Sequence, residues 1–319
     1  MKIAVLDAAT LGGDLDLSPL SEIGEVQVWQ GTRPEEMAAH LGDAEIAVVN
    51  KVRMNGETLR GNRGLRLICI AATGFDNIDT AWCGENGIAV CNVKGYSTDS
   101  VAQLTVAMAL HLTCRLGEYM EAVRDGSYSA GGVANRLTPP YHEIAGKTWG
   151  IAGYGSIGRR VADAARALGC RVIAFKRTPE AGVECVSAEE LCRRSDILSV
   201  HLPLNAETRN LFSRERIALM KPGAVFINAA RGAETDEAAL AEALREGRLG
   251  GLGVDVYTRE PFPEDHPFYA LRNHPGACFT PHMAWGAVEA RERCLREIME
   301  NIRAFERGER RNRVDRTPG

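Results

Sequence analysis

Short apolar runs alternate with amphipathic stretches along most of this chain, and the runs have the length of buried β-strands. Five runs fall in the first hundred residues, and six more follow after residue 145. This alternation is typical of α/β proteins with parallel sheets, so the pattern predicts two α/β domains in succession. The predicted strands are KIAVLD (2–7), VQVWQ (26–30), IAVVN (46–50), RLICIA (66–71), IAVCNV (88–93), TWGIAG (148–153), RVIAF (171–175), ILSVHL (197–202), AVFINAA (224–230), LGGLGVDV (249–256) and ACFTPH (277–282).

Two predicted helices bear on the domain organisation. Residues 100–126 are apolar on most sides, which predicts one long and largely buried helix. Residues 289–309 form a charged amphipathic helix that follows a complete sheet, so we expect its apolar face to pack on the first domain. That domain is then discontinuous, with residues 1–98 and 286–319, and residues 99–285 form the second domain. Shorter helices are predicted at RPEEMAAHLG (33–42), SIGRRVADAARALG (156–169) and DEAALAEALREG (236–247), and the basic tail 309–316 is expected to be solvated.

Composition and charge are those of an ordinary globular protein. The 319 residues exceed the usual size of one hydrophobic core. The net charge of -4, without long runs of one sign, gives no reason to expect nucleic acid or a membrane as a partner. The nine cysteines include no Cys-x-x-Cys pair and lie mostly among apolar neighbours. We therefore expect reduced thiols, a cytoplasmic location and no metal site.

A glycine-rich turn separates a predicted strand from a predicted helix. It reads Gly153-Tyr154-Gly155-Ser156-Ile157-Gly158. In such a turn the first glycine allows a tight bend, the second lets the backbone approach a pyrophosphate, and the third lets helix and strand pack closely. The helix N-terminus faces the phosphates. The turn predicts a dinucleotide-binding site.

The next strand ends in basic residues where an NAD-binding unit usually carries an acid. Lys176 and Arg177, followed by Thr178, occupy this place. A carboxylate there accepts hydrogen bonds from the ribose hydroxyls and repels a 2′-phosphate. Two cations suit a phosphate, which arginine can bind with two parallel hydrogen bonds. We expect NADP to be favoured, with NAD possible.

Three polar residues follow predicted strands further along the chain. Arg231 lies in INAARG, Glu260 in DVYTREP and His282 in TPHMAW. Oxidising a 2-hydroxy acid, or reducing a 2-keto acid, needs a group that exchanges a proton with the oxygen while hydride moves. Histidine suits that role, a carboxylate beside it favours the imidazolium, and arginine can hold the substrate carboxylate. The trio predicts such an enzyme.

These motifs together resemble the D-isomer-specific 2-hydroxyacid dehydrogenases, over nearly the whole chain. The resemblance is strongest to their glycerate dehydrogenase, hydroxypyruvate reductase and glyoxylate reductase branch. It implies two Rossmann-like doubly wound domains of the formate/glycerate dehydrogenase type, with a discontinuous substrate domain. It also implies an NAD(P)-dependent reduction of a small 2-keto acid such as hydroxypyruvate or glyoxylate. The matching motifs are AATGFDNID (71–79), YSTDSVAQLTVAMAL (96–110), GKTWGIAGYGSIG (146–158), HLPLNAETRN (201–210), INAARG (227–232), DVYTREP (255–261) and TPHMAWG (280–286).

The resemblance implies a role for each of the three polar residues. His282 would be the acid/base, Glu260 its partner, and Arg231 the residue that binds and polarises the substrate. The backbone amides of residues 72–74 would receive the substrate carboxylate. The residues implied to line the substrate pocket are Lys51, Val52, Ala72, Thr73, Gly74, Arg231 and Trp285.

The resemblance also implies cofactor contacts and a homodimer. The dimers of the family pair through their nucleotide domains, and residues 118–145 resemble the arm that makes this contact. Asp255 would lie near the nicotinamide carboxamide, and residues 201–203 beside the adenine. Besides the glycine turn and residues 176–178, the implied cofactor residues are Thr98, His201, Leu202, Pro203, Thr208, Ala229, Ala230, Arg231, Asp255, His282 and Gly286.

Other functions stay open on the residues alone. A dehydrogenase of a different or larger 2-hydroxy acid would carry the same motifs, although the formate enzymes pair glutamine with the histidine where this chain has Glu260. An NAD(P)H-sensing binding protein, like the corepressors of this superfamily, can retain all three polar residues. A methyltransferase would explain the glycine turn but not Arg231 or His282.

Overall fold

The computed structural model describes residues 1–315, and the chain divides into two compact units. Unit 1 comprises Met1–Ser97 and Trp285–Gly319, and unit 2 comprises Thr98–Ala284. Each boundary lies one residue before the predicted one. All strands within the two sheets pair in parallel, so the α/β fold class is confirmed.

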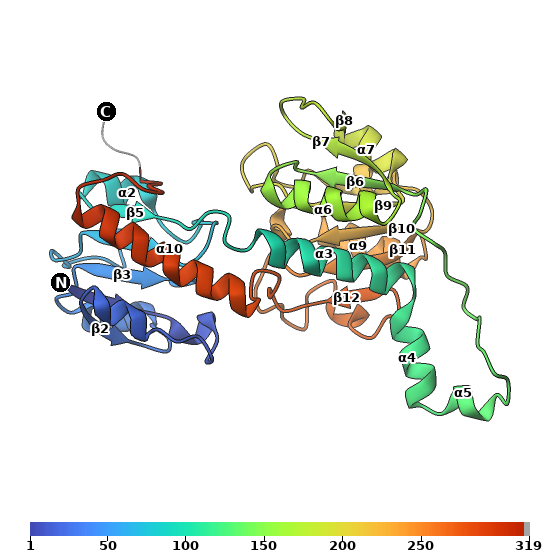
Figure 1. Ribbon diagram of the computed structural model, residues 1–319, viewed down its shortest axis with the longest axis horizontal. Helices are drawn as coiled ribbons and strands as arrows, with labels where there is room; N and C mark the ends of the chain where they lie inside the picture. The colour runs from blue at the N-terminus through green and yellow to red at the C-terminus, as the bar shows by residue number, and fades with distance from the viewer. Residues whose placement is uncertain (316–319) are drawn as a thin grey trace. The chain divides into compact units, whose positions relative to one another are not determined.

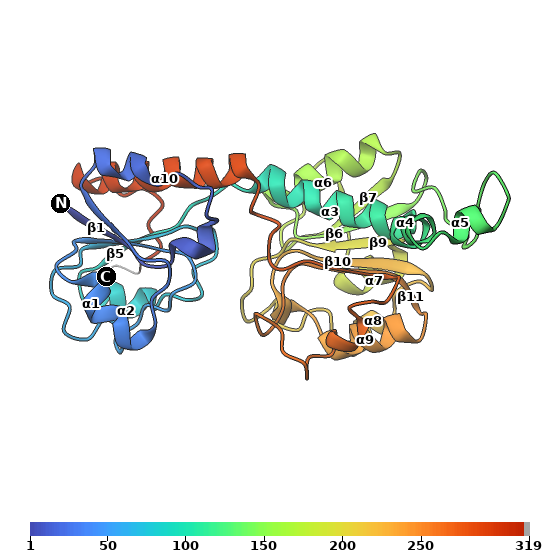
Figure 2. The ribbon, with the colours of Figure 1, turned by 90° about the horizontal axis from the view of Figure 1, so that it is seen from below.

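Unit 1 contains a five-stranded sheet in the order β2-β1-β3-β4-β5, which is doubly wound. One face packs against the last helix, α10, through residues such as Val5, Val48, Ile298 and Ile302. Figure 2 shows α10 on one side of this sheet and α1 and α2 on the other. The predicted packing of the last helix on the first domain is confirmed. The elements are β1 (Lys2–Val5), β2 (Glu25–Val28), α1 (Met37–Leu41), β3 (Ile46–Val49), β4 (Leu67–Ile70), α2 (Thr80–Glu85), β5 (Ala89–Cys91) and α10 (Val288–Glu306).

The basic tail packs on unit 1 over residues 311–315, so the prediction that it is solvated is wrong for these residues, whereas Glu309 and Arg310 are exposed. Val314 N donates to Val90 O, and the Asp315 carboxylate accepts a hydrogen bond from Val90 N. Arg313 pairs with Asp315 at 2.5 Å, which neutralises this buried acid. The tail thereby supplies hydrogen-bond partners for the backbone groups at the edge of β5. Residue 316 lies outside the described residues.

Unit 2 contains a seven-stranded sheet in the order β12-β11-β10-β9-β6-β7-β8. The chain runs from β6 outward to β8 and resumes on the other side of β6 with β9, so the winding reverses between β6 and β9. Ligands of open α/β sheets bind at the carboxyl ends of the strands beside such a reversal. The strands are β6 (Thr148–Ala152), β7 (Arg171–Phe175), β8 (Glu184–Cys185), β9 (Ile197–Val200), β10 (Ala224–Asn228), β11 (Leu249–Val254) and β12 (Ala277–Phe279).

Helices cover both faces of this second sheet. The helices α3 and α6 pack on one face through residues such as Met108 and Val161. The helices α7, α8 and α9 pack on the other through residues such as Leu191 and Leu240. The two layers are visible in Figure 2. The helices are α3 (Thr98–Thr113), α4 (Leu116–Arg124), α5 (Ser127–Ala130), α6 (Ser156–Ala167), α7 (Ala188–Arg194), α8 (Arg214–Ala218) and α9 (Glu237–Arg245).

The predicted single helix over residues 100–126 is wrong, because two helices occupy this stretch. The chain breaks at Arg115, whose φ of 53° lies in the left-handed region. Its guanidinium binds Glu118 at 2.5 Å, within the first turn of α4. A left-handed residue cannot continue an α-helix, and the residue at the break is neither glycine nor proline, although Gly117 follows in the first turn of α4.

The segment from α4 to β6 extends away from the sheet of unit 2, as Figure 1 shows. Seven of the twelve exposed large hydrophobic side chains of residues 1–315 lie on it. They are Leu116, Met120, Val123, Tyr128, Val133, Leu137 and Tyr141. Clusters of exposed apolar side chains usually mark interaction surfaces.

None of the helices formed by residues 1–315 combines the length and the apolar character needed to cross a membrane.

The packing of α10 on unit 1 can be tested by truncating its buried side chains. Ile302 is fully buried, and Ile302→Ala should lower the free energy of unfolding by about 2–5 kcal/mol, because it removes packed apolar surface and leaves a cavity. Urea unfolding followed by tryptophan fluorescence measures the change. Arg296→Ala, on the exposed side of α10, should change the stability by less than about 0.5 kcal/mol. Equal losses for both variants would contradict this packing.

Candidate active site

The predicted glycine turn connects β6 to the N-terminus of α6. Gly153 has a φ of +96°, and a Cβ there would lie 2.6 Å from the carbonyl oxygen of His201. A Cβ on Gly158 would lie 2.1 Å from the carbonyl oxygen of Gly153, so neither position admits a side chain. A Cβ on Gly155, in contrast, would meet no atom of the described residues within 4 Å. The open space at Gly155, beside the first amides of α6, fits a pyrophosphate.

The strand end after β7 carries more charged groups than predicted. Lys176 forms an ion pair with Glu180, and Glu180 also lies 2.8 Å from the guanidinium of Arg159. Hydrogen bonding to Lys176 and the charge of Arg159 hold the pKa of Glu180 below its usual value. Arg177 and Thr178 are exposed. The site therefore combines three cations with one carboxylate and keeps a net positive charge.

His201 and Leu202 follow β9 at the reversal point of the sheet. Burial lowers the pKa of His201 to about 3, so its imidazole is neutral at physiological pH. Trp149 Nε1 donates to Ser199 Oγ at 3.0 Å, and Ser199 Oγ lies 3.0 Å from His201 Nε2. These contacts fix the ring of His201 against the sheet.

The other predicted cofactor residues of unit 2 lie in loops or at helix ends. Thr208 is buried, and its hydroxyl donates to Pro203 O at 2.7 Å, so it shapes the turn after β9. Thr98 is the first residue of α3. Ala229 and Ala230 are half-buried just after β10, and Tyr154, Ser156 and Ile157 complete the glycine turn. For all these residues, contact with a cofactor stays a prediction.

Three neighbouring strands bring the predicted catalytic trio to one edge of the sheet. Arg231 follows β10, Glu260 follows β11 and His282 follows β12, and these strands are adjacent. The carboxyl ends of parallel strands meet at the same edge, so the three residues share it. Asn228 Nδ2 donates to Arg231 O at 2.8 Å and thereby supports the Arg231 loop.

His282 and Glu260 are in direct contact. His282 Nδ1 lies 2.6 Å from Glu260 Oε2. An ionised carboxylate can only accept hydrogen bonds, so Nδ1 carries the proton in this contact. His282 has a φ of 53°, a conformation that costs a non-glycine residue about 1–3 kcal/mol and persists only where the surroundings hold it.

Asp255 holds the loop that carries His282. It is fully buried, and burial raises its pKa. Its Oδ1 accepts hydrogen bonds from Thr280 Oγ1 at 2.5 Å and Met283 N at 2.9 Å, and its Oδ2 accepts one from Ala284 N at 2.9 Å. The carboxylate is thus occupied by the protein's own loop, and its contact with a nicotinamide carboxamide stays a prediction.

Apart from Arg231, the predicted substrate residues belong to unit 1, where buried Asp7 holds one of their loops. Its carboxylate accepts hydrogen bonds from the amides of Asn50 at 2.9 Å, Lys51 at 2.6 Å and Val52 at 3.1 Å. Asn77 Nδ2 donates to Val52 O at 2.7 Å. Burial raises the pKa of Asp7. The loop at residues 50–52 is therefore rigidly attached to the end of β1.

The second substrate loop, residues 72–74, follows β4, with two of its carbonyl groups bound and its amides available. Val93 N donates to Ala72 O at 3.0 Å, and Asn92 Nδ2 donates to Thr73 O at 2.7 Å. Within the described part of the chain, the amides of Ala72, Thr73 and Gly74 donate no hydrogen bond. Such amides can receive a carboxylate.

Trp285 and Gly286 also lie in unit 1, just before α10. The ring of Trp285 packs edge-on against Tyr96, with centroids 6.3 Å apart. Gly286 O accepts a hydrogen bond from Arg291 Nε at 3.0 Å. Both residues are therefore tied to the core of unit 1.

Several residues of the site are absent from the sequence prediction. Asp7 and Asn77 support the first substrate loop, and Arg159 and Glu180 surround Lys176. Two of them carry a signal in the sequence, because Asp7 is the last residue of a predicted strand and Arg159 directly follows the third glycine of the turn. Glu180 lies in a segment without regular structure and carries no such signal.

Two curated relatives match nearly the whole chain. A glycerate dehydrogenase from Methylorubrum extorquens is 36% identical over 98% of this chain and 99% of its own. A hydroxypyruvate reductase from Blautia hydrogenotrophica is 34% identical over 97% of this chain and 98% of its own.

Solved structures agree with this similarity. An acyclic imino acid reductase, Bsp5, in complex with NADPH and D-Arg superimposes with a TM-score of 0.87 at 30% identity, over 98% of this chain and 100% of its own. A D-lactate dehydrogenase from Aquifex aeolicus, complexed with NAD and lactic acid, gives a TM-score of 0.85 at 28% identity, over 97% of this chain and 96% of its own.

The family model described as D-isomer specific 2-hydroxyacid dehydrogenase, NAD binding domain, matches residues 106–284. The glycine turn thus lies in an NAD(P)-binding domain, and the chain is an oxidoreductase that belongs to the D-isomer specific 2-hydroxyacid dehydrogenase family.

Proposed function

We propose that this enzyme reduces small 2-keto acids, hydroxypyruvate or glyoxylate first among them, with His282 as the acid/base. The contact between His282 Nδ1 and Glu260 carries the proposal, because it pairs the imidazole with a carboxylate that favours the imidazolium and fixes the orientation of the ring. The relatives named glycerate dehydrogenase and hydroxypyruvate reductase support the substrate class. The nine cysteines, all free, support the cytoplasm as the compartment.

The reaction needs a proton and a hydride at the same carbonyl group. The hydride for the carbonyl carbon would come from a reduced nicotinamide, held by the NAD(P)-binding domain. His282 Nε2 donates a proton to the carbonyl oxygen, and Glu260 stabilises the imidazolium before that transfer. In the opposite direction His282 accepts the hydroxyl proton. The left-handed backbone of His282 and its support by Asp255 keep the ring in one orientation.

Two groups are suited to the substrate carboxylate. The amides of Ala72, Thr73 and Gly74 offer hydrogen bonds that the protein itself does not use within its described residues. Arg231 offers a guanidinium, which binds carboxylates with two parallel hydrogen bonds and polarises a carbonyl. A small 2-keto acid has both a carboxylate and a carbonyl group, so it can use both kinds of contact.

A substrate panel tests the proposal. Purified enzyme with NADPH or NADH should reduce hydroxypyruvate or glyoxylate faster than pyruvate or 2-ketoisocaproate. His282→Ala should lower kcat on the best substrate by about two orders of magnitude or more, because general acid/base catalysis is lost. His274→Ala, which alters a histidine after η5 (Tyr269–Leu271), should keep near-wild-type turnover.

Three results would count against the proposal. Turnover by His282→Ala close to wild type would remove this residue from the mechanism. No turnover of any keto acid, together with NAD(P)H binding in calorimetry, would favour the NAD(P)H-sensing alternative. Preference for the larger keto acid would favour a dehydrogenase of larger 2-hydroxy acids.

For the cofactor, we propose that NADP is favoured and NAD accepted. Lys176, Arg177 and Arg159 supply three positive charges at the strand end, and Glu180 supplies one negative charge. A 2′-phosphate would gain hydrogen bonds from these cations. Glu180 opposes this preference, since it pairs with two of the cations and would repel the phosphate.

Removing the cations and removing the carboxylate should change the affinity for NADPH in opposite directions. Lys176→Ala with Arg177→Ala should weaken NADPH binding roughly 10- to 100-fold, the cost of lost hydrogen bonds to a charged group, and NADH binding much less. Glu180→Gln should strengthen NADPH binding, because it releases Lys176 and Arg159. Titration of nucleotide fluorescence measures both affinities. Equal changes for the two cofactors would contradict the phosphate role.

We also propose that two copies associate through the arm at residues 118–145. The exposed apolar side chains of this arm support a second copy as its occupant, since burial would remove them from water. Tyr119 OH donates to Pro139 O at 2.5 Å, and Arg136 Nη1 binds Ser127 Oγ at 2.9 Å. These internal contacts give the arm a defined shape before association.

Light scattering should report a dimer at micromolar concentration. Val123→Glu with Leu137→Glu should shift it towards the monomer, because each places a charge among apolar groups of the arm. Val288→Glu is the matched control, since Val288 is similarly exposed but begins α10. A wild-type monomer, or a dimer unaffected by the arm substitutions, would contradict the proposed association.

A further inference from the structure

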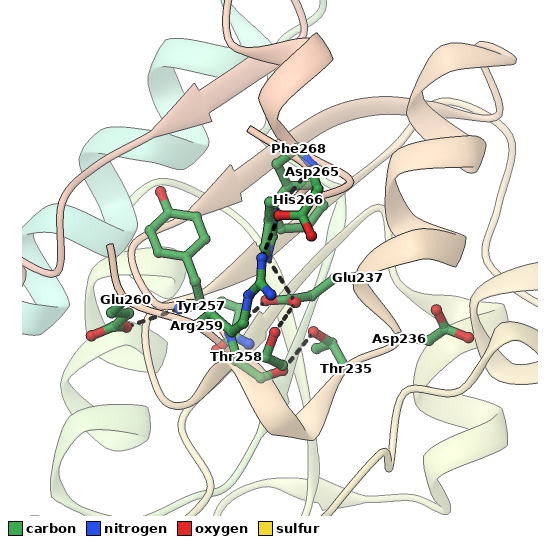
Figure 3. Close-up of polar contacts among 12 residues, drawn as sticks. Thr235, Asp236, Glu237, Tyr257, Thr258, Arg259, Glu260, Asp265, His266 and Phe268 are labelled. Atoms are coloured by element: carbon green, nitrogen blue, oxygen red, sulfur yellow. Dashed lines mark hydrogen bonds and ion pairs between the residues drawn. The ribbon is translucent and has the colours of Figure 1, made fainter. Parts of the chain in front are cut away.

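A second carboxylate–histidine pair lies close to the catalytic one, on the buried side of the same loop. Glu237 is the first residue of α9, and His266 lies in the segment between Glu260 and η5. Their side chains are 7% and 3% exposed, and His266 Nε2 lies 3.0 Å from Glu237 Oε2. Figure 3 shows Glu237 between His266 and Thr258. The chemistry proposed above does not use this pair.

The protonation of His266 follows from its neighbours. Its Nδ1 accepts a hydrogen bond from Phe268 N at 3.3 Å, and an amide can only donate. Nδ1 therefore carries no proton, and Nε2–H donates to Glu237. The pair consists of a neutral imidazole and a carboxylate. Because Glu237 has no cation in this contact, hydrogen bonds must stabilise its buried charge.

Glu237 obtains these hydrogen bonds from the loop that carries Glu260. Its Oε1 accepts from Thr258 N at 2.9 Å, and its Oε2 accepts from Thr258 Oγ1 at 2.5 Å as well as from His266. One carboxylate thus holds both the backbone and the side chain of Thr258. Thr258 lies only two residues before Glu260.

The same loop orients the Glu260 carboxylate. Tyr257 N donates to Glu260 Oε1 at 2.9 Å, and this leaves Oε2 on His282 Nδ1. The Tyr257 ring packs edge-on against His266 and Phe262, at centroid distances of 5.9 and 4.7 Å. The segment around Glu260 is therefore held on one side by Glu237 and on another by the aromatic cluster that surrounds His266.

We propose that Glu237 and His266 are a positioning pair that sets the orientation of Glu260, and through Glu260 that of His282. This proposal rests on the proposed role of His282. Glu237 fixes Thr258, Thr258 fixes the amide of Tyr257, and that amide directs the Glu260 carboxylate towards His282. Neither Glu237 nor His266 contacts a reacting atom, so neither is a catalytic residue. Their effect is on the alignment and the pKa of the group that exchanges the proton.

The test compares Glu237→Gln with Glu260→Gln in pH profiles of kcat/KM. Glu260→Gln should lower the apparent pKa of the catalytic base by roughly 1–3 units, because an adjacent carboxylate stabilises the imidazolium. Glu237→Gln keeps the side-chain shape but cannot accept all three hydrogen bonds. It should lower the same pKa by a smaller amount and reduce kcat roughly 10- to 100-fold through misalignment. The KM for NAD(P)H should stay unchanged.

A double variant separates positioning from general stability. With Glu260→Gln already present, Glu237→Gln should cause no further pKa change, because its effect passes through the Glu260 carboxylate. The charge of Asp255 also acts on His282, and every variant leaves Asp255 in place. Asp265→Asn is the matched control, since it breaks the exposed ion pair with Arg259 on the same loop, and its pH profile should match wild type.

Other outcomes would overturn the proposal. A Glu237→Gln enzyme with a lower melting temperature but the wild-type pH profile would reduce the pair to a structural role. If Glu237→Gln does not fold, Thr258→Val replaces it in the test. Thr258→Val should lower the apparent pKa of the catalytic base by a smaller amount. Thr258→Ser keeps the hydroxyl and should restore the wild-type pKa. No shift in Thr258→Val would then overturn the proposal. If Glu260→Gln itself leaves the profile unchanged, the acid/base role of His282 fails and the positioning role fails with it.

Discussion

Loops at the carboxyl ends of parallel strands leave backbone amides without partners in the sheet, and in this protein buried carboxylates accept their hydrogen bonds. Asp7 binds three successive amides after β3, and Asp255 binds two after β12. Glu237 binds the amide of Thr258 after β11. Hydrogen bonds to a charged acceptor are stronger than neutral ones, at about 1.5–3 kcal/mol each. The loops that carry the candidate site are therefore ordered by the protein itself, and ligand binding need not organise them.

The fold and the main chemical groups follow closely from local patterns in the sequence. Apolar runs such as those at β3 and β9 predict their strands because buried parallel strands are apolar on both faces. The glycine turn is readable because two of its glycines are required by close backbone contacts. The break at Arg115 could not be predicted, because arginine does not favour the left-handed conformation. Glu237 is equally hard to recognise, because its role depends on a loop that is distant in the sequence.

The strand end after β7 shows how a sequence motif can be right in place and incomplete in chemistry. Lys176 and Arg177 lie where the motif puts them. Glu180, four residues after Lys176, offsets part of their charge, and Arg159 adds to it from α6. The phosphate-binding character of the site is therefore a balance among four side chains from two elements. The sequence motif identifies Lys176 and Arg177 but neither Glu180 nor Arg159.

The position of α10 in the chain constrains how unit 1 is completed during synthesis. The sheet of unit 1 is made from the first hundred residues, but the helix that covers one face is made last. A nascent chain therefore leaves the ribosome with the apolar residues of β1, β3 and β4 uncovered until unit 2 has been translated. Unit 2 has its own continuous segment and can fold in the meantime. Until α10 has been made, this apolar face remains in contact with water and can associate with apolar surfaces of other chains.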